Sequence, residues 1–427
     1  MHCSKGRFSA CTWIFAAVIF INLYYCYLID SEEDINLLLV NISPRAYALL
    51  FALAWGGLNF VKLLKYPEPE YKYGKWMIAM LALIVLSAIQ SFFLHEQSIL
   101  LGIYEQRIVL AWTLLYFPIR KCLYYRKLKY QKIIKIFVVL CVIQLTIFIS
   151  QYFLRDSIAF TYVGEGMRNG RIRYYYSPVL LDLMYLFSLD YFARAKGIRR
   201  FLGAGLAGAV LFEVMVVQQF RLSSMGLILT LGLFVLLLRG KVYYKMVYFV
   251  IGAFALGVLF TTPLVQNVLN TVLHNDYDSG MQIRFVGKGL YMETLARHPV
   301  LGGGFPSIKC AASYYASGWS RRIYLSDNGV FAFAYLYGGL GIIWVVSLWA
   351  KLLRSGTIIR KKTSELTFLL YPMFFIITCI NELHWYWEYG PVIFVIFLCL
   401  AEEKRRMADS YVWRKVWKIG GQSGKIC

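Results

Sequence analysis

Charged side chains are scarce in this sequence, and acidic ones are the scarcest. Only 16% of the 427 residues are charged, and 23 Asp and Glu stand against 45 Lys and Arg. A water-soluble domain has about 25% charged residues. The apolar runs reach the roughly 20 residues that cross a bilayer as a helix. The composition therefore excludes a soluble globular domain and indicates a membrane protein.

The signatures of disulfide scaffolds, metal sites and nucleotide sites are also missing. The nine Cys show no framework spacing, and the five His form no HExxH or other metal-ligand pattern. The GGGFPS segment at 302–307 is not followed by Lys-Ser or Lys-Thr, so it is not a Walker phosphate loop. We therefore expect neither a metal ion nor another cofactor.

The net charge of +22 would suggest a nucleic-acid partner in a soluble protein. Here the basic residues lie in short clusters between apolar runs, where they orient the chain and contact anionic lipid headgroups. We therefore expect a lipid bilayer, and no nucleic acid, as the partner of these clusters.

Hydropathy predicts an all-α fold: a polytopic membrane helix bundle of about twelve spans, forming a single domain over 1–427. The expected spans lie near residues 9–29, 46–64, 76–94, 98–118, 133–153, 177–193, 201–219, 224–238, 246–262, 328–350, 366–381 and 387–401. Lys-rich and Lys-poor loops alternate between them. By the positive-inside rule, the Lys-rich loops and both termini are cytoplasmic.

Two outer loops are long enough to carry function, 154–176 and 263–327. The larger loop is inserted between two spans and contains a stretch with helical spacing of apolar residues, 281–297. His298-Pro299 is expected to end this helix, and Gly302 to Gly304 to form a turn. We therefore expect short helices in the outer loop.

The outward-facing segments carry Arg rather than Lys. These segments contain only two lysines, Lys288 and Lys309. Their arginines are Arg45, Arg155, Arg168, Arg171, Arg173, Arg221, Arg284, Arg297, Arg321 and Arg322. The planar guanidinium suits bidentate binding of a diphosphate or another polyanion. The alternative is that individual members, above all Arg45, Arg155 and Arg297, pair with lipid phosphates at the interface.

Two places in this set have further features. Arg168, Arg171 and Arg173 lie in GEGMRNGRIRYYY, whose tyrosines suit either sugar stacking or the aromatic belt of a membrane interface. Arg221 lies in a turn of a few residues between two apolar spans, next to Gln and Ser residues. Its charge is therefore expected at the outer membrane surface.

Ionisable residues also fall inside predicted spans, where they are costly and often functional. They are Glu105, Arg107, Asp182, Asp190 and Glu213. For Asp190 and Glu105 we expect structural pairing within the bundle. Glu105 and Arg107 are two residues apart, so on a continuous helix they would not face each other.

Three landmarks between Arg221 and about residue 343 resemble the O-antigen polymerase and ligase superfamily of bacterial membrane enzymes. Arg221 with Ser223-Ser224 is similar to that family's Ser/Thr–Arg turn. Arg284, followed by HPVLGGGFPS, resembles its Arg and His-Pro-x-x-Gly-x-Gly loop. LSDNGVFAFAYLYGGLGIIW resembles its re-entry into the membrane. Ligases of the family have His where this chain has Asp327, which favours a repeat-unit polymerase.

The resemblance implies a glycosyltransferase of the bacterial cytoplasmic membrane that acts in O-antigen, capsule or exopolysaccharide biosynthesis. Its substrate would be an oligosaccharide on undecaprenyl diphosphate at the outer face, and a chain-length regulator and a flippase would be partners. Arg221 and Arg284 would stabilise the leaving diphosphate without a metal. Asp327 is the first candidate for the base, His298 the second and Glu165 the third.

The remaining site residues would bind substrate. They are Arg168, Arg171, Arg173, Glu165, Arg321 and Arg322. Two alternatives stay open, an O-antigen ligase and a lipid-linked oligosaccharide flippase. A flippase would more typically show internal repeats and short loops on both sides.

Overall fold

The fold is seen in a computed structural model of the chain. It describes residues 10–23, 28, 35–37, 40–42, 44–65, 71–155, 157–158, 161–168, 171–176, 178–238, 279–381, 383 and 390–423. The predicted span near 246–262 and the first part of the large outer loop, 263–278, lie outside the described residues.

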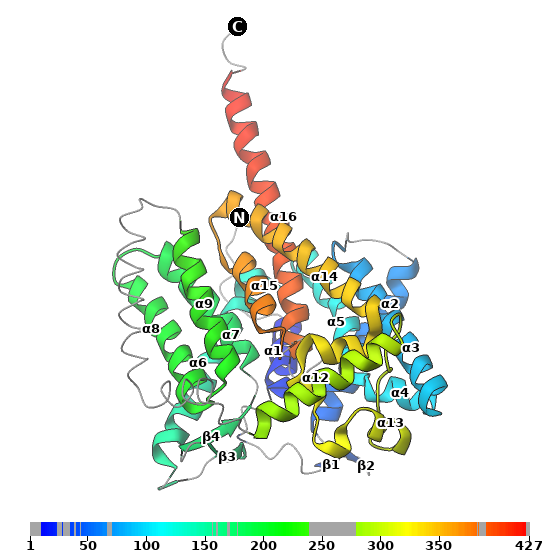
Figure 1. Cartoon of the computed structure of the whole chain (residues 1–427). Coiled ribbons are helices and arrows are strands. Elements are labelled where there is room, and N and C mark those ends of the chain that lie inside the picture. Colours follow the sequence, from blue (N-terminus) through cyan, green and yellow to red (C-terminus); the bar gives the residue numbers. More distant parts are fainter. Residues whose placement is uncertain are drawn as a thin grey trace.

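The described chain is a bundle of helices with two small β-hairpins at one end (Figure 1). The helices are α1 (Ala10–Asn22), α2 (Pro44–Lys65), α3 (Gly74–His95), α4 (Ile99–Glu105), α5 (Arg107–Tyr124), α6 (Tyr130–Leu154), α7 (Val179–Arg194), α8 (Arg199–Phe212), η2 (Glu213–Val217), α9 (Arg221–Leu237), α12 (Ser279–Arg297), α13 (Ala311–Ala316), η3 (Trp319–Arg321), η4 (Leu325–Asp327), α14 (Gly329–Thr363), α15 (Thr367–Thr378) and α16 (Gly390–Ser423). The hairpins pair β1 (Ile35–Leu37) with β2 (Val40–Ile42) and β3 (Gly164–Arg168) with β4 (Arg171–Tyr175).

The helical membrane protein expected from hydropathy is confirmed. Within the described residues, four helical segments are long and apolar enough to cross a membrane, and a fifth is added if the bent pair α4–α5 counts as one span. Shorter apolar helices lie at Leu49–Lys62, Arg221–Leu237 and Thr367–Thr378. The count of twelve spans stays a prediction.

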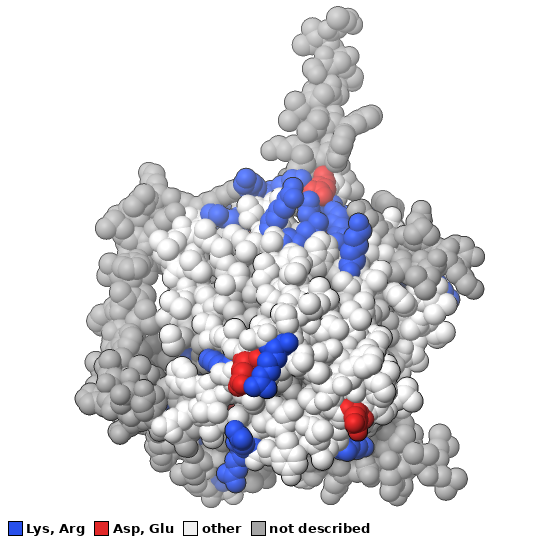
Figure 2. All heavy atoms as spheres, turned by 45° about the vertical axis from the view of Figure 1, so that its right-hand side comes forward, with Lys and Arg blue, Asp and Glu red and all other residues white. Residues whose placement is uncertain are grey.

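The two ends of the bundle differ in content. Figure 1 places both hairpins, α12 and α13 at one end, and the projecting part of α16 at the other. In Figure 2, Lys and Arg gather where α16 leaves the bundle, and a broad uncharged belt lies next to them. The predicted Lys-rich loops and the predicted Arg-bearing loops therefore lie at opposite ends. Which end faces the cytoplasm stays a prediction of the Lys pattern.

The predicted loop 154–176 contains a structure that was not expected, the antiparallel β3–β4 hairpin. Its register sets Glu165 opposite Tyr174 and Gly166 opposite Arg173. The all-α expectation is therefore wrong for this segment. The alternation in GEGMRNGRIRYYY supports two short strands, because side chains two residues apart face the same side of a strand.

A second departure is a bend of 67° between α4 and α5, within the predicted span 98–118. The buried Gln106 holds it: Nε2 donates to the carbonyls of Ile84 and Gly102, each at 3.1 Å, and Oε1 accepts from Tyr337 at 3.0 Å. The bend brings Arg107 Nη1 to 3.8 Å from Glu105 Oε2. The expectation that these two side chains do not meet is therefore wrong, because the helix is not continuous.

The large outer loop follows its prediction closely where it is described. The helix α12 ends at Arg297, directly before His298-Pro299. The next residues form a turn that enters a break in α14, where Gly338 has non-helical angles (φ 63, ψ −160). The amide of Gly303 donates to Tyr335 O at 2.7 Å, and the amide of Gly339 donates to Pro299 O at 2.8 Å. The turn thus replaces hydrogen bonds that the break removes from the helix.

The same turn is bound from its other side by a polar stripe on α3. Gln90 Nε2 donates to Gly302 O at 3.0 Å, and Ser91 Oγ donates to Phe305 O at 2.9 Å. Ser87 Oγ donates to Leu336 O of α14 at 2.8 Å. The HPVLGGGFPS segment therefore joins α12, α14 and α3, and it fixes where α12 lies across the end of the bundle.

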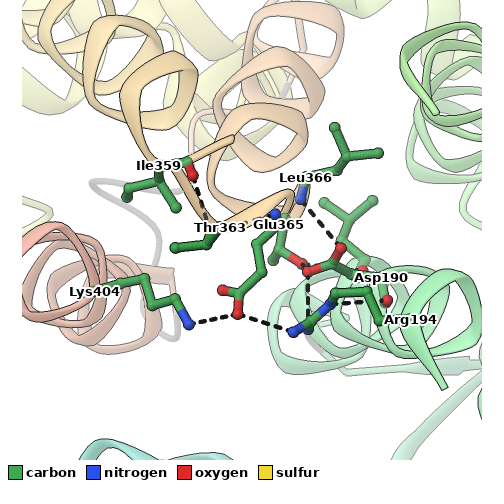
Figure 3. A network of polar contacts seen from close by, with 9 residues as sticks. Asp190, Arg194, Ile359, Thr363, Glu365, Leu366 and Lys404 are labelled. Carbon is green, nitrogen blue, oxygen red and sulfur yellow. Dashed lines mark hydrogen bonds and ion pairs between the residues drawn. The ribbon is translucent and has the colours of Figure 1, made fainter. Parts of the chain in front are cut away.

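The opposite end is held by ion pairs around α16 whose carboxylates are buried. Figure 3 shows Arg194 of α7 between Asp190 (3.2 Å) and Glu365 (2.9 Å), with Lys404 of α16 also bound to Glu365. Asp190 additionally accepts from the Leu366 amide at 3.1 Å. The expected structural pairing of Asp190 is confirmed.

The break in α14 supplies a test of the fold. A Cβ on Gly338 would lie 2.2 Å from Val300 O, and its backbone conformation is one that only glycine adopts readily. We expect Gly338→Ala to destabilise the protein by about 1–3 kcal/mol from the backbone alone. Thermal unfolding of the purified protein in detergent measures this as a lowered Tm.

The matched control is Gly232→Ala in α9, where a Cβ meets nothing within 4 Å. Alanine favours a helix over glycine by about 1 kcal/mol, so this variant should keep or raise the Tm. Equal Tm values for the two variants would contradict the insertion of the turn.

Candidate anion-binding site at the hairpin end

Arg221 opens α9 after a tight polar turn. The preceding η2 is a single π-helical turn, and Gln219 has a left-handed backbone (φ 54). Gln218 Nε2 donates to both carboxylate oxygens of the buried Glu213, each at 3.0 Å. These contacts fix the turn, so Arg221 stands at the N-terminal end of α9, where the sequence predicts it.

The β3–β4 hairpin brings Arg173 to this turn. Gln219 Nε2 donates to Ile172 O at 3.0 Å, which ties β4 to the start of α9. The Arg173 guanidinium lies 5.0 Å from the centroid of the Phe220 ring and 4.6 Å from that of Tyr175. Aromatic faces attract a cation and shield it from water, so Arg173 is held against the turn that bears Arg221.

Arg284 reaches the same region from α12 and meets Asp327. Its Nη2 lies 3.5 Å from Asp327 Oδ1. Gly287, one turn along α12, permits this approach: a Cβ there would lie 2.7 Å from Ile323 and 3.0 Å from Asn328 Nδ2. The small residue on α12 therefore lets the segment around η4 pack closely enough for the ion pair.

Lys288 adds a cation whose role the sequence did not reveal. It lies four residues after Arg284, so the two side chains share one face of α12. Its Nζ donates to Asn381 Oδ1 at 2.7 Å and lies 5.4 Å from the Phe331 ring centroid. Burial lowers the pKa of Lys288, and the positive charge of Arg284 lowers it further. The i, i+4 spacing was the available signal for Lys288, whereas nothing marked Asn381.

These groups act on one another electrostatically. The pKa of Arg173 is lowered, first by burial and then by the charges of Arg284 and Arg221, while Tyr175 and Asp327 raise it. Segments far apart in sequence thus place their charges within reach of one another. We call Arg173, Arg221, Arg284, Lys288 and Asp327 the basic cluster. Its four cations outnumber its single carboxylate.

Two buried donors of the basic cluster have no hydrogen-bond partner among the described residues. Arg173 Nε and Arg284 Nε are both buried without a hydrogen-bond partner, and Asn328 Oδ1 beside them is an unsatisfied acceptor. A buried donor without a partner costs about 1–3 kcal/mol. An anion that accepted hydrogen bonds from the two guanidinium groups would remove this cost. The arrangement therefore suits an anionic ligand with several oxygen atoms.

Other predicted site residues lie elsewhere. His298 follows the far end of α12, about 21 Å along the axis from Arg284, where it interacts electrostatically with His95. Arg297 is exposed and paired with Glu293. The structure therefore does not bring His298 into the basic cluster.

The remaining candidates are distributed over the hairpin and the loop before α14. Arg168 and Arg171 are opposite each other in the register of the β3–β4 hairpin, next to its turn. Glu165 is exposed on β3. The side chains of Arg168 and Arg171 lie outside the described residues. Arg321 and Arg322 are exposed in and directly after η3. These residues stay predictions as substrate contacts.

Comparison with known proteins does not place the chain in a family. No protein-family model and no curated protein matches this chain. In the part of the chain that the structure describes, no group of three or more His, Cys, Asp or Glu could hold a metal ion. The site is therefore interpreted from its own geometry.

Inorganic pyrophosphate should bind the purified protein, and Arg284→Gln should weaken it about 10- to 100-fold, because charge-assisted hydrogen bonds are lost. Isothermal titration calorimetry measures both affinities. Arg297→Gln, on the same helix but outside the cluster, is the control and should bind as the wild type does. Equal losses of affinity in the two variants would show that pyrophosphate binding depends only on the net charge of the protein.

Proposed function

We propose that the chain is a membrane glycosyltransferase that polymerises oligosaccharide repeat units carried on undecaprenyl diphosphate. The reaction would take place at the outer face of the bacterial cytoplasmic membrane, during surface-polysaccharide synthesis. One observation carries the proposal: Arg173 of β4 interacts electrostatically with Arg221 of α9, Arg284 of α12 and Asp327, and Arg284 also pairs with Asp327 at 3.5 Å. Cations suited to a diphosphate thus adjoin a group suited to accept a proton.

The chemistry would be a displacement at the anomeric carbon of the donor sugar. An acceptor hydroxyl oxygen attacks this carbon, the bond from the carbon to the diphosphate oxygen breaks, and the lipid diphosphate leaves with both bonding electrons. Negative charge grows on the diphosphate as the bond breaks, and preorganised guanidinium groups stabilise it. Arg221 and Arg284 would have this role, and Arg173 would bind a further phosphate oxygen. Cations of this kind would make a divalent metal unnecessary.

The proton of the acceptor hydroxyl would pass to Asp327. This carboxylate is partly exposed and lies 3.5 Å from the Arg284 guanidinium, so one arginine adjoins both the base and the leaving group. A base has to lie within hydrogen-bond reach of the hydroxyl that it deprotonates. The position of Asp327 favours it over His298, at the other end of α12, and over Glu165, on the exposed hairpin strand.

Polymerisation in cells tests the proposal. Arg221→Lys and Arg284→Lys keep the charge but lose the bidentate fork, so each should reduce polymer about 100-fold or more. Arg155→Lys, outside the basic cluster, should have a mild effect. The readout is the polysaccharide ladder on a gel, with the membrane level of each variant measured by immunoblot.

Deletion of the gene separates the alternatives by the species that accumulates. Single lipid-linked units at the outer face support a polymerase. Accumulated lipid-linked polymer would identify a ligase, and units retained at the inner face a flippase. Full-length polymer in both Lys variants would remove Arg221 and Arg284 from the site.

A second test separates the base from the binding groups. Asp327→Asn removes the proton acceptor and leaves the three arginines, so turnover of a lipid-linked donor in vitro should fall about 100-fold or more. Pyrophosphate should bind this variant at least as tightly as the wild type, because a negative charge has left the cluster. Loss of binding together with turnover would show that Asp327 only positions Arg284.

A further inference from the structure

The opposite end of the bundle contains a pocket between α2 and α5. These two helices touch where Gly56 faces Leu114: a Cβ on Gly56 would lie 2.7 Å from the Leu114 Cβ and 2.9 Å from its carbonyl carbon. Beyond this contact, a cavity of about 400 Å³ lies between them. Its lining residues are Trp55, Leu58, Asn59, Lys62, Pro118, Lys121, Cys122, Tyr125 and Lys127.

The lining has a regular pattern on both helices. The α2 residues follow the spacing i, i+3, i+4, i+7, and so do the three α5 residues together with the C-cap residue Tyr125, so each helix contributes one continuous face. Trp55 and Pro118, nearest the contact at Gly56, make one end of the pocket apolar. Lys62 stands about two turns beyond Trp55 and Lys121 about one turn beyond Pro118, both near the C-terminal ends of their helices. The pocket therefore changes from apolar to cationic along its length.

The cationic end lies where α16 leaves the bundle. Arg406 Nη1 of α16 donates to Tyr124 O at 3.4 Å, directly beside the lining residue Tyr125. Lys127 joins Lys62 and Lys121 there, and none of the nine lining residues is acidic. By the Lys pattern, this is the cytoplasmic end. Three lysines at one end of a pocket attract an anion.

The flank of the pocket faces the bilayer. Leu58 is 65% exposed and its neighbour Val61 is 53% exposed, both on the apolar surface of α2. Exposed aliphatic side chains in a membrane helix contact lipid tails. A ligand that entered here would have an apolar part beside Leu58 and a charged part among the lysines. A phospholipid has this division, whereas a free phosphate or a nucleotide does not.

We propose that this pocket binds an anionic phospholipid, with its phosphate headgroup among Lys62, Lys121 and Lys127 and its chains along Trp55 and Leu58. The cytoplasmic leaflet is rich in anionic lipids, and each lysine near the membrane surface strengthens their binding to a protein. Tyr125 supplies a hydroxyl at the cationic end, one turn beyond Lys121. The bound lipid would fill the space between α2 and α5 and hold the two helices together.

The test uses the full chain in phosphatidylcholine nanodiscs, titrated with phosphatidylglycerol and followed by native mass spectrometry. Each lysine should contribute about 5-fold to affinity, so Lys62→Gln, Lys121→Gln and Lys127→Gln together should weaken binding on the order of 100-fold. The corresponding triple Arg variant keeps the charge and should retain the lipid, which separates loss of charge from misfolding.

The matched control changes three exposed lysines of the same end that lie outside the pocket, Lys135, Lys196 and Lys361, each to Gln. This control should bind phosphatidylglycerol as the wild type does. Equal weakening in the two triple Gln variants would overturn the proposal, because only the net charge would then matter. Inorganic phosphate that competes at the same concentration as the lipid would also overturn it, because the site would then be one for a soluble anion.

Discussion

The insertion of the turn after α12 into the break of α14 is the constraint on which the site depends. A Cβ on Gly302 would lie 2.3 Å from Tyr335 O, and one on Gly304 would lie 2.3 Å from Ser91 Oγ. Both glycines also have positive φ. The turn therefore fits only without side chains at these positions. It fixes the end of α12, and thereby the line along which Arg284 approaches Asp327.

Neutral contacts hold the basic cluster in position without neutralising it. Gln219 binds the Ile172 carbonyl, Asn381 binds Lys288, and Gly287 admits Asn328 against α12. The first and third contacts fix backbone segments, the second fixes the Lys288 side chain, and all three leave the positive charge in place. Groups ordered before the ligand arrives need no reorganisation during reaction, which is the condition for strong electrostatic stabilisation of a transition state.

The sequence predicts the parts of this site that rest on local signals. The helix 281–297 has apolar periodicity and a His-Pro stop, and the turn at Arg221 lies between two apolar runs, so both were found. The bend at Gln106 and the break at Gly338 were not, because each depends on hydrogen bonds from residues distant in sequence. Convergence of Arg173 with Arg284 likewise results from packing. The excess of Arg in the loops predicted to face outward marked the set, but it did not separate Arg284 from Arg297 on the same helix.

Among the described residues, the arginines at the two ends of the bundle differ in burial and in their ion-pair partners. Near α16, Arg120 pairs with both Glu402 and Glu403, each at 2.8 Å. At the hairpin end, Arg173 has no carboxylate within ion-pair distance among the described residues, and Arg284 has Asp327 at 3.5 Å. The Arg120 side chain is only 3% exposed, and a buried charge without a partner is strongly unfavourable, so this arginine needs its carboxylates. The Arg284 side chain is 42% exposed, so it can hold its charge with a single, longer ion pair and remain accessible to the anionic ligand proposed for the basic cluster.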